Sequence, residues 1–175
     1  MVDPRVRRFS GPIAAFAAMV AIVMATGAVL FARKIGFDGG HVQAFYLGSE
    51  ATFAPPRSLA GLLEVAVPHL LAVPLLLFVT LHLVAFALGA RRRPFALLAG
   101  ITWGCATVGI GAGFAIRFAW PALAPLTVVA FVGLEATMLA WLLLLAAAIL
   151  PPSRGESRDG GLTASEAAPP RAARW

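Results

Sequence analysis

Four long apolar runs constrain most strongly what this chain can fold into. They cover about residues 11–32, 60–90, 94–116 and 126–150. A helix needs about 20 apolar residues to cross the hydrocarbon core of a bilayer, and each run reaches that length. The sequence therefore predicts an all-α fold, an integral membrane four-helix bundle in up-down-up-down order, with the lipid bilayer as its surroundings.

The composition agrees with a membrane protein. The chain is 60% hydrophobic and 13% charged, whereas soluble domains carry about 25% charged residues. These values exclude an ordinary cytosolic enzyme, a disordered chain and a disulfide-rich secreted module. The net charge of +6 comes from arginines scattered between the apolar runs, so no nucleic-acid partner is predicted.

Lysine and arginine are distributed unevenly between the two sides of the predicted bundle. With a cytoplasmic N-terminus, ten of them lie inside and four outside: Arg5, Arg7, Arg8, Arg91, Arg92, Arg93, Arg154, Arg158, Arg171 and Arg174 against Arg33, Lys34, Arg57 and Arg117. Basic residues are enriched in cytoplasmic segments. The count predicts that both termini are cytoplasmic, residues 1–10 as a short N-terminus and residues 151–175 as a disordered tail. Abundant Ala, Arg, Gly and Pro favour a bacterial inner (plasma) membrane.

Four ionisable side chains fall inside the predicted spans. Glu64, His69 and His82 lie in the second span, and Glu135 lies about nine residues into the fourth. Such a group costs about 2.5 to 3.5 kcal/mol at the centre of a span. An ionised Glu135 cannot face lipid, so it must be neutral or paired. Each of the four residues therefore needs a function or a partner.

Three of these residues and one arginine are expected at a similar depth near the outer surface. Glu64, His69, Arg117 and Glu135 form this predicted outer polar cluster. A carboxylate near an imidazole suits proton handling or an oriented ligand. The alternative is a charge-neutral group that only fixes helix register, and the sequence leaves both open.

The two histidines of the second span raise the possibility of b-type haem. His69 and His82 are thirteen residues apart, about 20 Å along a helix, and about 140° apart around it at 100° per residue. They cannot face one groove unless Pro74 kinks the helix. Met24 and Met138 are possible second ligands, because methionine pairs with histidine in some cytochromes. A homodimer would supply a further histidine, and the alternative is that both histidines bond to neighbouring helices.

Small residues recur at helical spacing in the third span. Ala96, Gly100 and Gly104 form one row, and a second row contains Cys105, Gly109 and Gly113. Rows of small residues let helices approach closely, so this span is expected at the packed centre of the bundle or at a dimer face. The connection over about residues 34–57 is rich in aromatic residues, which predicts a short interfacial helix followed by a turn.

One stretch of the chain resembles a known family. Phe45 to Phe86 contains a Tyr-Leu-Gly loop (46–48), a Pro-Pro step (55–56), a Gly-Leu-Leu-Glu-Val start (61–65) and a histidine towards each end of the second span. It resembles a family of uncharacterised small four-span bacterial inner-membrane proteins. Some members carry the name elongation factor 1-alpha, which a four-span apolar chain does not support. The resemblance implies the same membrane architecture and draws attention to Glu64, His69 and His82.

Two functions are compatible with these features. The first is a non-enzymatic accessory or interaction subunit of a membrane complex, for which no catalytic residue is expected. The second is a small electron-transfer protein that binds b-type haem through His69 and His82, with Glu64 or Glu135 handling protons. A homodimer or a larger membrane complex is expected in either case.

Overall fold

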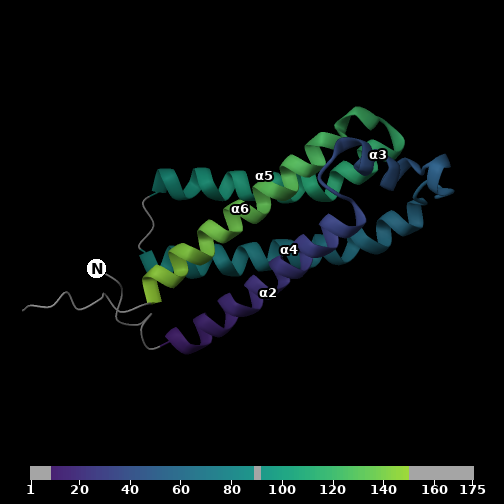
Figure 1. Ribbon diagram of the computed structural model, residues 1–175. Helices are drawn as coiled ribbons and strands as arrows, with labels where there is room; N and C mark the ends of the chain where they lie inside the picture. The colour runs from purple at the N-terminus through teal and green to yellow at the C-terminus, as the bar shows by residue number, and fades with distance from the viewer. Residues whose placement is uncertain (1–8, 89–91, 150–175) are drawn as a thin grey trace, which may run out of the picture.

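The computed structural model describes residues 9–88 and 92–149. Four long helices dominate it: α2 (Ser10–Lys34), α4 (Leu59–Leu88), α5 (Arg92–Phe118) and α6 (Ala124–Ile149) (Figure 1). All four are long and apolar enough to cross a membrane, which confirms the predicted all-α architecture with four spans. The predicted tail over residues 151–175 and most of the predicted N-terminal segment lie outside the described residues.

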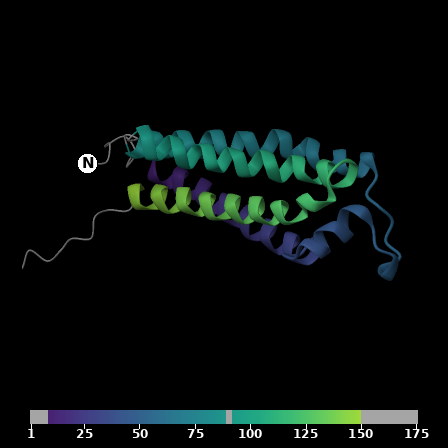
Figure 2. The same cartoon turned by 90° about the horizontal axis from the view of Figure 1, so that it is seen from above.

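Consecutive long helices run in opposite directions and form two layers. Helices α4 and α5 lie side by side in one layer, and α2 lies beside α6 in the other (Figure 2). Helix α6 packs against α2, α4 and α5 and also against the short helix α3 (Gly39–Leu47). The last span of the chain is therefore the helix around which the other elements assemble.

Helix α3 covers one end of the bundle, which we name the α3 end (Figure 1). Its N-terminus is capped by the Asp38 side chain, which accepts hydrogen bonds from the backbone N–H groups of Gly40 and His41 at 2.9 and 3.1 Å. The Gln43 side chain ties α3 to the turn before α6 by donating to the carbonyl of Pro121 at 3.1 Å. The short helix predicted in this connection is thus confirmed, and a 3₁₀ turn, η1 (Glu50–Thr52), follows it.

Two clusters of buried residues hold the bundle together. One lies at the end opposite α3, where the Trp141 indole donates a 3.0 Å hydrogen bond to Thr102 Oγ1 and meets Phe95 edge to face. The other lies at the α3 end and includes Val42 and Ile116, both fully buried. The span helices are less densely packed between the two clusters, and the candidate site lies there.

The two small-residue rows of α5 have different surroundings. Cys105, Gly109 and Gly113 face the interior between the helices. Gly100 and Gly104 are exposed, and a Cβ added at either would meet no atom within 4 Å. The first row therefore does not lie at the packed centre, where α6 is, and its outward position leaves the predicted dimer face as the open alternative.

Candidate functional site

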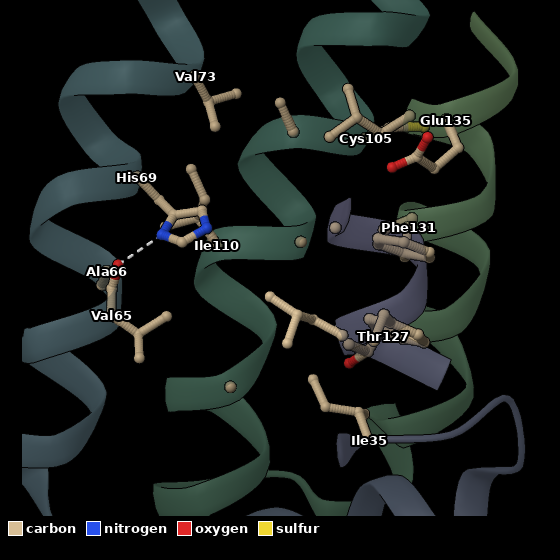
Figure 3. Close-up of a pocket in the computed structure, with 18 of the residues that line it drawn as sticks. Ile35, Val65, Ala66, His69, Val73, Cys105, Ile110, Thr127, Phe131 and Glu135 are labelled. Carbon is tan, nitrogen blue, oxygen red and sulfur yellow. Dashed lines mark hydrogen bonds between the residues drawn. The ribbon is translucent and has the colours of Figure 1, made fainter. Parts of the chain in front are cut away.

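A cavity of about 580 Å³ lies between α2, α4, α5 and α6 (Figure 3). Its size falls within the range of about 300 to 1,000 Å³ found for small-molecule sites. Most of its lining is aliphatic or aromatic. One wall is a stacked pair of rings, Phe31 of α2 and Phe131 of α6, with centroids 3.9 Å apart. The cavity thus offers an apolar space of ligand size at membrane depth.

His69 reaches this cavity from α4 (Figure 3). Its Nδ1 lies 2.7 Å from the backbone carbonyl oxygen of Val65. Since a carbonyl can only accept, Nδ1 carries the hydrogen, and the neutral ring keeps Nε2 as its unprotonated nitrogen. This arrangement fixes the tautomer and the ring orientation, as it does for many histidines that bind metals through Nε2.

Glu135 enters the cavity from α6, on the side opposite His69 (Figure 3). It is half-buried, and its Oε1 lies 3.9 Å from the position that a Cβ on Gly27 would occupy. Thr137, a possible partner for a neutral Glu135, instead donates to the carbonyls of Gly133 and Leu134 at 2.8 and 3.1 Å. Glu135 and His69 are therefore two polar groups on opposite walls of an apolar space.

Both predicted methionine partners also line the cavity. Met24 contributes from α2, and Met138, which is 3% exposed, contributes from α6. The cavity consequently contains one imidazole, that of His69, and two thioether sulfurs.

The other residues of the predicted site lie away from the cavity. Glu64 is exposed on α4 and is not part of the lining. His82 is also exposed, where its Nδ1 donates to the carbonyl of Phe78 at 2.7 Å and its ring lies 4.0 Å from the Phe78 ring. Arg117 donates from Nε to the backbone carbonyl of Arg57 at 2.9 Å. Of the predicted outer polar cluster, the cavity brings together only His69 and Glu135.

The polar residues at the α3 end of the cavity were not singled out from the sequence as site residues. Lys34, Arg57, Tyr46 and Thr127 all line the cavity there. Lys34 ends α2 and Arg57 lies just before α4. The ends of the apolar runs therefore predict that both residues lie at the same depth, near one surface of the membrane. Burial raises the pKa of the Tyr46 phenol, and the nearby positive charge of Arg57 partly offsets the rise.

The cavity opens between α2 and α4. Residues of these two helices line it and are also exposed, among them Val23 at 58% and Leu30 at 50% on α2, and Val65 at 60% on α4. The lining residues of α6 are half-buried or buried, as Ala130 and Phe131 illustrate. Helix α6 therefore forms the floor of the cavity, and the opening faces the surroundings of the spans.

A metal site formed by several acidic or sulfur ligands is not present in the described ranges. Nowhere in residues 9–88 and 92–149 do three His, Cys, Asp or Glu side chains gather closely enough to hold a metal ion. The single cysteine of the chain, Cys105, is free and lies against Gly133, where a Cβ would come within 2.7 Å of its Sγ. It therefore acts as a packing residue.

Comparison with known proteins gives one match. The sequence profile of a transmembrane helical domain family matches residues 36–156, which is more than half of the chain. No curated protein and no solved structure matches the chain. The match includes α3 and the last three spans. With four apolar helices in the structure, the chain is a multi-pass membrane protein that belongs to this family of transmembrane helical domains.

Proposed function

We propose that the protein is a non-enzymatic membrane protein that holds a small, largely apolar molecule between its spans. The cavity of about 580 Å³ carries this proposal, because it combines apolar walls with a few polar groups on different helices. The proposed role is that of an accessory subunit in a bacterial inner membrane, where the molecule serves a larger complex or a second copy. The exposed apolar side chains of the spans are available for contact with lipid and with such a partner.

Co-purification tests the binding role. The protein is purified from bacterial membranes in a mild detergent, and the small molecules that accompany it are identified by mass spectrometry. Gly109 lines the cavity, and a Cβ there would meet no atom within 4 Å, so Gly109→Leu should place an isobutyl group in the cavity and take up part of its volume. Gly104→Leu is the matched control, because Gly104 on the same helix is equally open and lies outside the cavity.

We expect the accompanying molecule to be lost from Gly109→Leu and retained by Gly104→Leu. An identical set of molecules with both variants and the unaltered protein would count against ligand binding in the cavity.

A second candidate function is electron transfer through b-type haem. The orientation of His69 favours it, because Nε2 is the free nitrogen and Met24 and Met138 line the same cavity. Histidine with methionine is an established axial pair. His82 lies outside the cavity, so this version replaces the pairing of His69 with His82 by His69 with a methionine. Glu135 is then the carboxylate positioned to handle protons.

An absorption spectrum of the protein from haem-replete cells, oxidised and reduced, tests this version. We expect a Soret band that is lost in His69→Ala and unchanged in His82→Ala, since the two imidazoles have different surroundings and similar exposure. A colourless protein, or equal loss in both variants, would exclude haem held by His69 in the cavity.

A further inference from the structure

The α3 end of the cavity carries two cations that have no anionic partner within the described ranges. Lys34 and Arg57 line the cavity there. In residues 9–88 and 92–149 the one contact within 4 Å between an acidic side chain and a basic or imidazole side chain joins Asp38 to His41 Nδ1 at 3.4 Å. Both side chains are exposed, and two positive charges at the edge of the cavity create a potential that favours an anion.

Arg57 is held in place by the protein itself. Its guanidinium carbon lies 4.3 Å from the centroid of the Phe45 ring, a cation–π contact. Its backbone N–H donates to the carbonyl of Tyr46 at 3.0 Å, and its own carbonyl accepts from Arg117 Nε at 2.9 Å. Because these contacts fix the residue before any ligand arrives, little conformational entropy is lost on binding.

Thr127 is the third polar residue at this end. It is 3% exposed, it lines the cavity, and its hydroxyl has no hydrogen-bond partner within the described part of the chain. By contrast, the span residues Thr26, Thr102 and Thr137 each donate at 2.8 Å to the carbonyl four residues earlier. A buried hydroxyl without a partner is costly, but this oxygen is closed off from the cavity, so a ligand could meet it only after the side chain rotates.

A fourth group at this end is the phenol of Tyr46. Tyr46 lines the cavity and packs against Gly113. Because burial raises its pKa, the phenol keeps its hydrogen at neutral pH and remains a donor. The α3 end thus presents two cations and the Tyr46 phenol, all suited to an anionic oxygen.

We propose that the cavity binds an elongated apolar molecule that ends in an acid group, and that Lys34 and Arg57 hold this acid group at the α3 end. This inference rests on the proposed binding function and adds the chemistry of the ligand. The lining runs along α6 from Thr127 to Met138, eleven residues or about 16 Å. Glu135 lies within this length and would repel an acid group, whereas the apolar part can pass beside it.

Two kinds of molecule share this chemistry. One is a fatty acid, and the other is haem, whose propionates are acid groups on an apolar ring. Two pairs of probes therefore test the proposal: cis-parinaric acid with its methyl ester, and haem with its dimethyl ester. The protein is reconstituted in phosphatidylcholine vesicles, so that the lipid carries no net charge. Energy transfer from tryptophan reports the first pair, and absorption reports the second.

The signal of Gly109→Leu, in which the leucine side chain takes up part of the cavity, serves as the background for both pairs. We expect the unaltered protein to bind one acid at least about tenfold more tightly than its ester, through charge-assisted hydrogen bonds. The pair that shows the preference identifies the kind of molecule. In the double variant Lys34→Gln, Arg57→Gln, the ratio of acid affinity to ester affinity should fall to about one. The affinity for the ester itself should change by less than about twofold.

Two further variants separate binding from folding. Arg33→Gln is the matched control, because Arg33 is exposed beside Lys34 and does not line the cavity; it should keep the full preference. Thr127→Val has nearly the same volume and removes only the unpartnered hydroxyl, whose oxygen is closed off from the cavity, so it should keep the preference for the acid to within about twofold.

The outcomes distinguish this inference from the proposed function. If an ester binds above the background and as tightly as its acid, or if the double variant keeps the preference, the acid-group inference is overturned and the binding function stands. If neither acid nor ester of either pair exceeds the background of Gly109→Leu, the binding function itself fails.

Discussion

The ring of Tyr46 occupies the space that a side chain on Gly113 would need. A Cβ at Gly113 would lie 2.7 Å from Tyr46 Cε1 and 3.1 Å from its hydroxyl oxygen. Helix α3 can therefore pack onto α5 only because this position of α5 has no side chain. The contact closes the α3 end of the bundle and places the phenol at the cavity.

Gly113→Ala should destabilise the protein for this reason. The methyl group would displace the ring of Tyr46, and overpacking of this kind costs about 1 to 3 kcal/mol. Gly104→Ala is the control on the same helix, where a Cβ has open space. Thermal unfolding in mild detergent should show a lower midpoint for Gly113→Ala and an equal or higher midpoint for Gly104→Ala. Equal midpoints for the two variants would mean that α3 does not depend on this contact.

The hydrogen bond from Trp141 to Thr102 should stabilise the end of the bundle opposite α3. Thr102→Val removes the acceptor and leaves the indole N–H buried without a partner, at a cost of about 1 to 3 kcal/mol. Thr80→Val is the matched change, because Thr80 is also fully buried and its hydroxyl has no partner in the described ranges. In denaturant unfolding, we expect a lower free energy of unfolding for Thr102→Val and an equal or higher one for Thr80→Val. The reverse order would contradict the assigned bond.

Ionisation of Tyr46 should depend on burial and on Arg57. Tyr46 is the only tyrosine of the chain, so tyrosinate absorbance reports it alone. We expect a titration midpoint above the ordinary pKa of about 10, and a still higher midpoint in Arg57→Ala, because the positive charge of Arg57 lowers this pKa. A midpoint at the ordinary value would show that the phenol is open to water.

The same shift predicts how stability changes at high pH. A pKa that is raised by folding means that the neutral phenol contributes stability below pH 10, and that this contribution is lost as pH rises through the raised value. Unfolding midpoints of the unaltered protein should therefore fall more steeply in this range than those of Tyr46→Phe, which cannot ionise. Parallel curves would argue against the assigned burial.

Orientation in the membrane can be tested with fused reporters. The excess of arginine predicts cytoplasmic termini and a non-cytoplasmic α3 end. Phe53, which is 94% exposed, is a suitable point for a phosphatase that is active only outside the cytoplasm. We expect activity from that fusion and fluorescence from green fluorescent protein fused after residue 175. The opposite pair of results would reverse the proposed topology.

The sequence predicted the spans well because length and hydropathy decide them. Each of the four predicted runs overlaps one long helix, and α4 continues through Pro68 and Pro74. Backbone groups in lipid must be hydrogen-bonded within the protein, and an unbroken apolar run of about 20 residues meets this requirement as a helix. Which helices pack together follows from side-chain shape instead, and the central place of α6 was therefore not predictable.

The candidate site was only partly predictable. The position of a residue along its helix gives its depth in the membrane, but it does not give the side of the helix on which the side chain lies. Glu64 and His69 are five residues apart, so they point about 140° apart around α4 at 100° per residue. Only His69 lines the cavity. The separation of His69 from His82 is consistent with the same angular argument. Lys34 ends α2, whereas Arg57 belongs to the connection between two spans, and the position of Arg57 at the cavity depends on how that connection folds.

The opening between α2 and α4 sets how an occupant would reach the cavity. It lies along the length of the spans, so molecules arrive by lateral diffusion within one leaflet and not from the aqueous phase. Occupancy then follows the mole fraction of the molecule among the lipids. A dissociation constant expressed in aqueous units would combine partitioning with binding, and dilution with lipid or detergent would empty the site even at a constant total concentration.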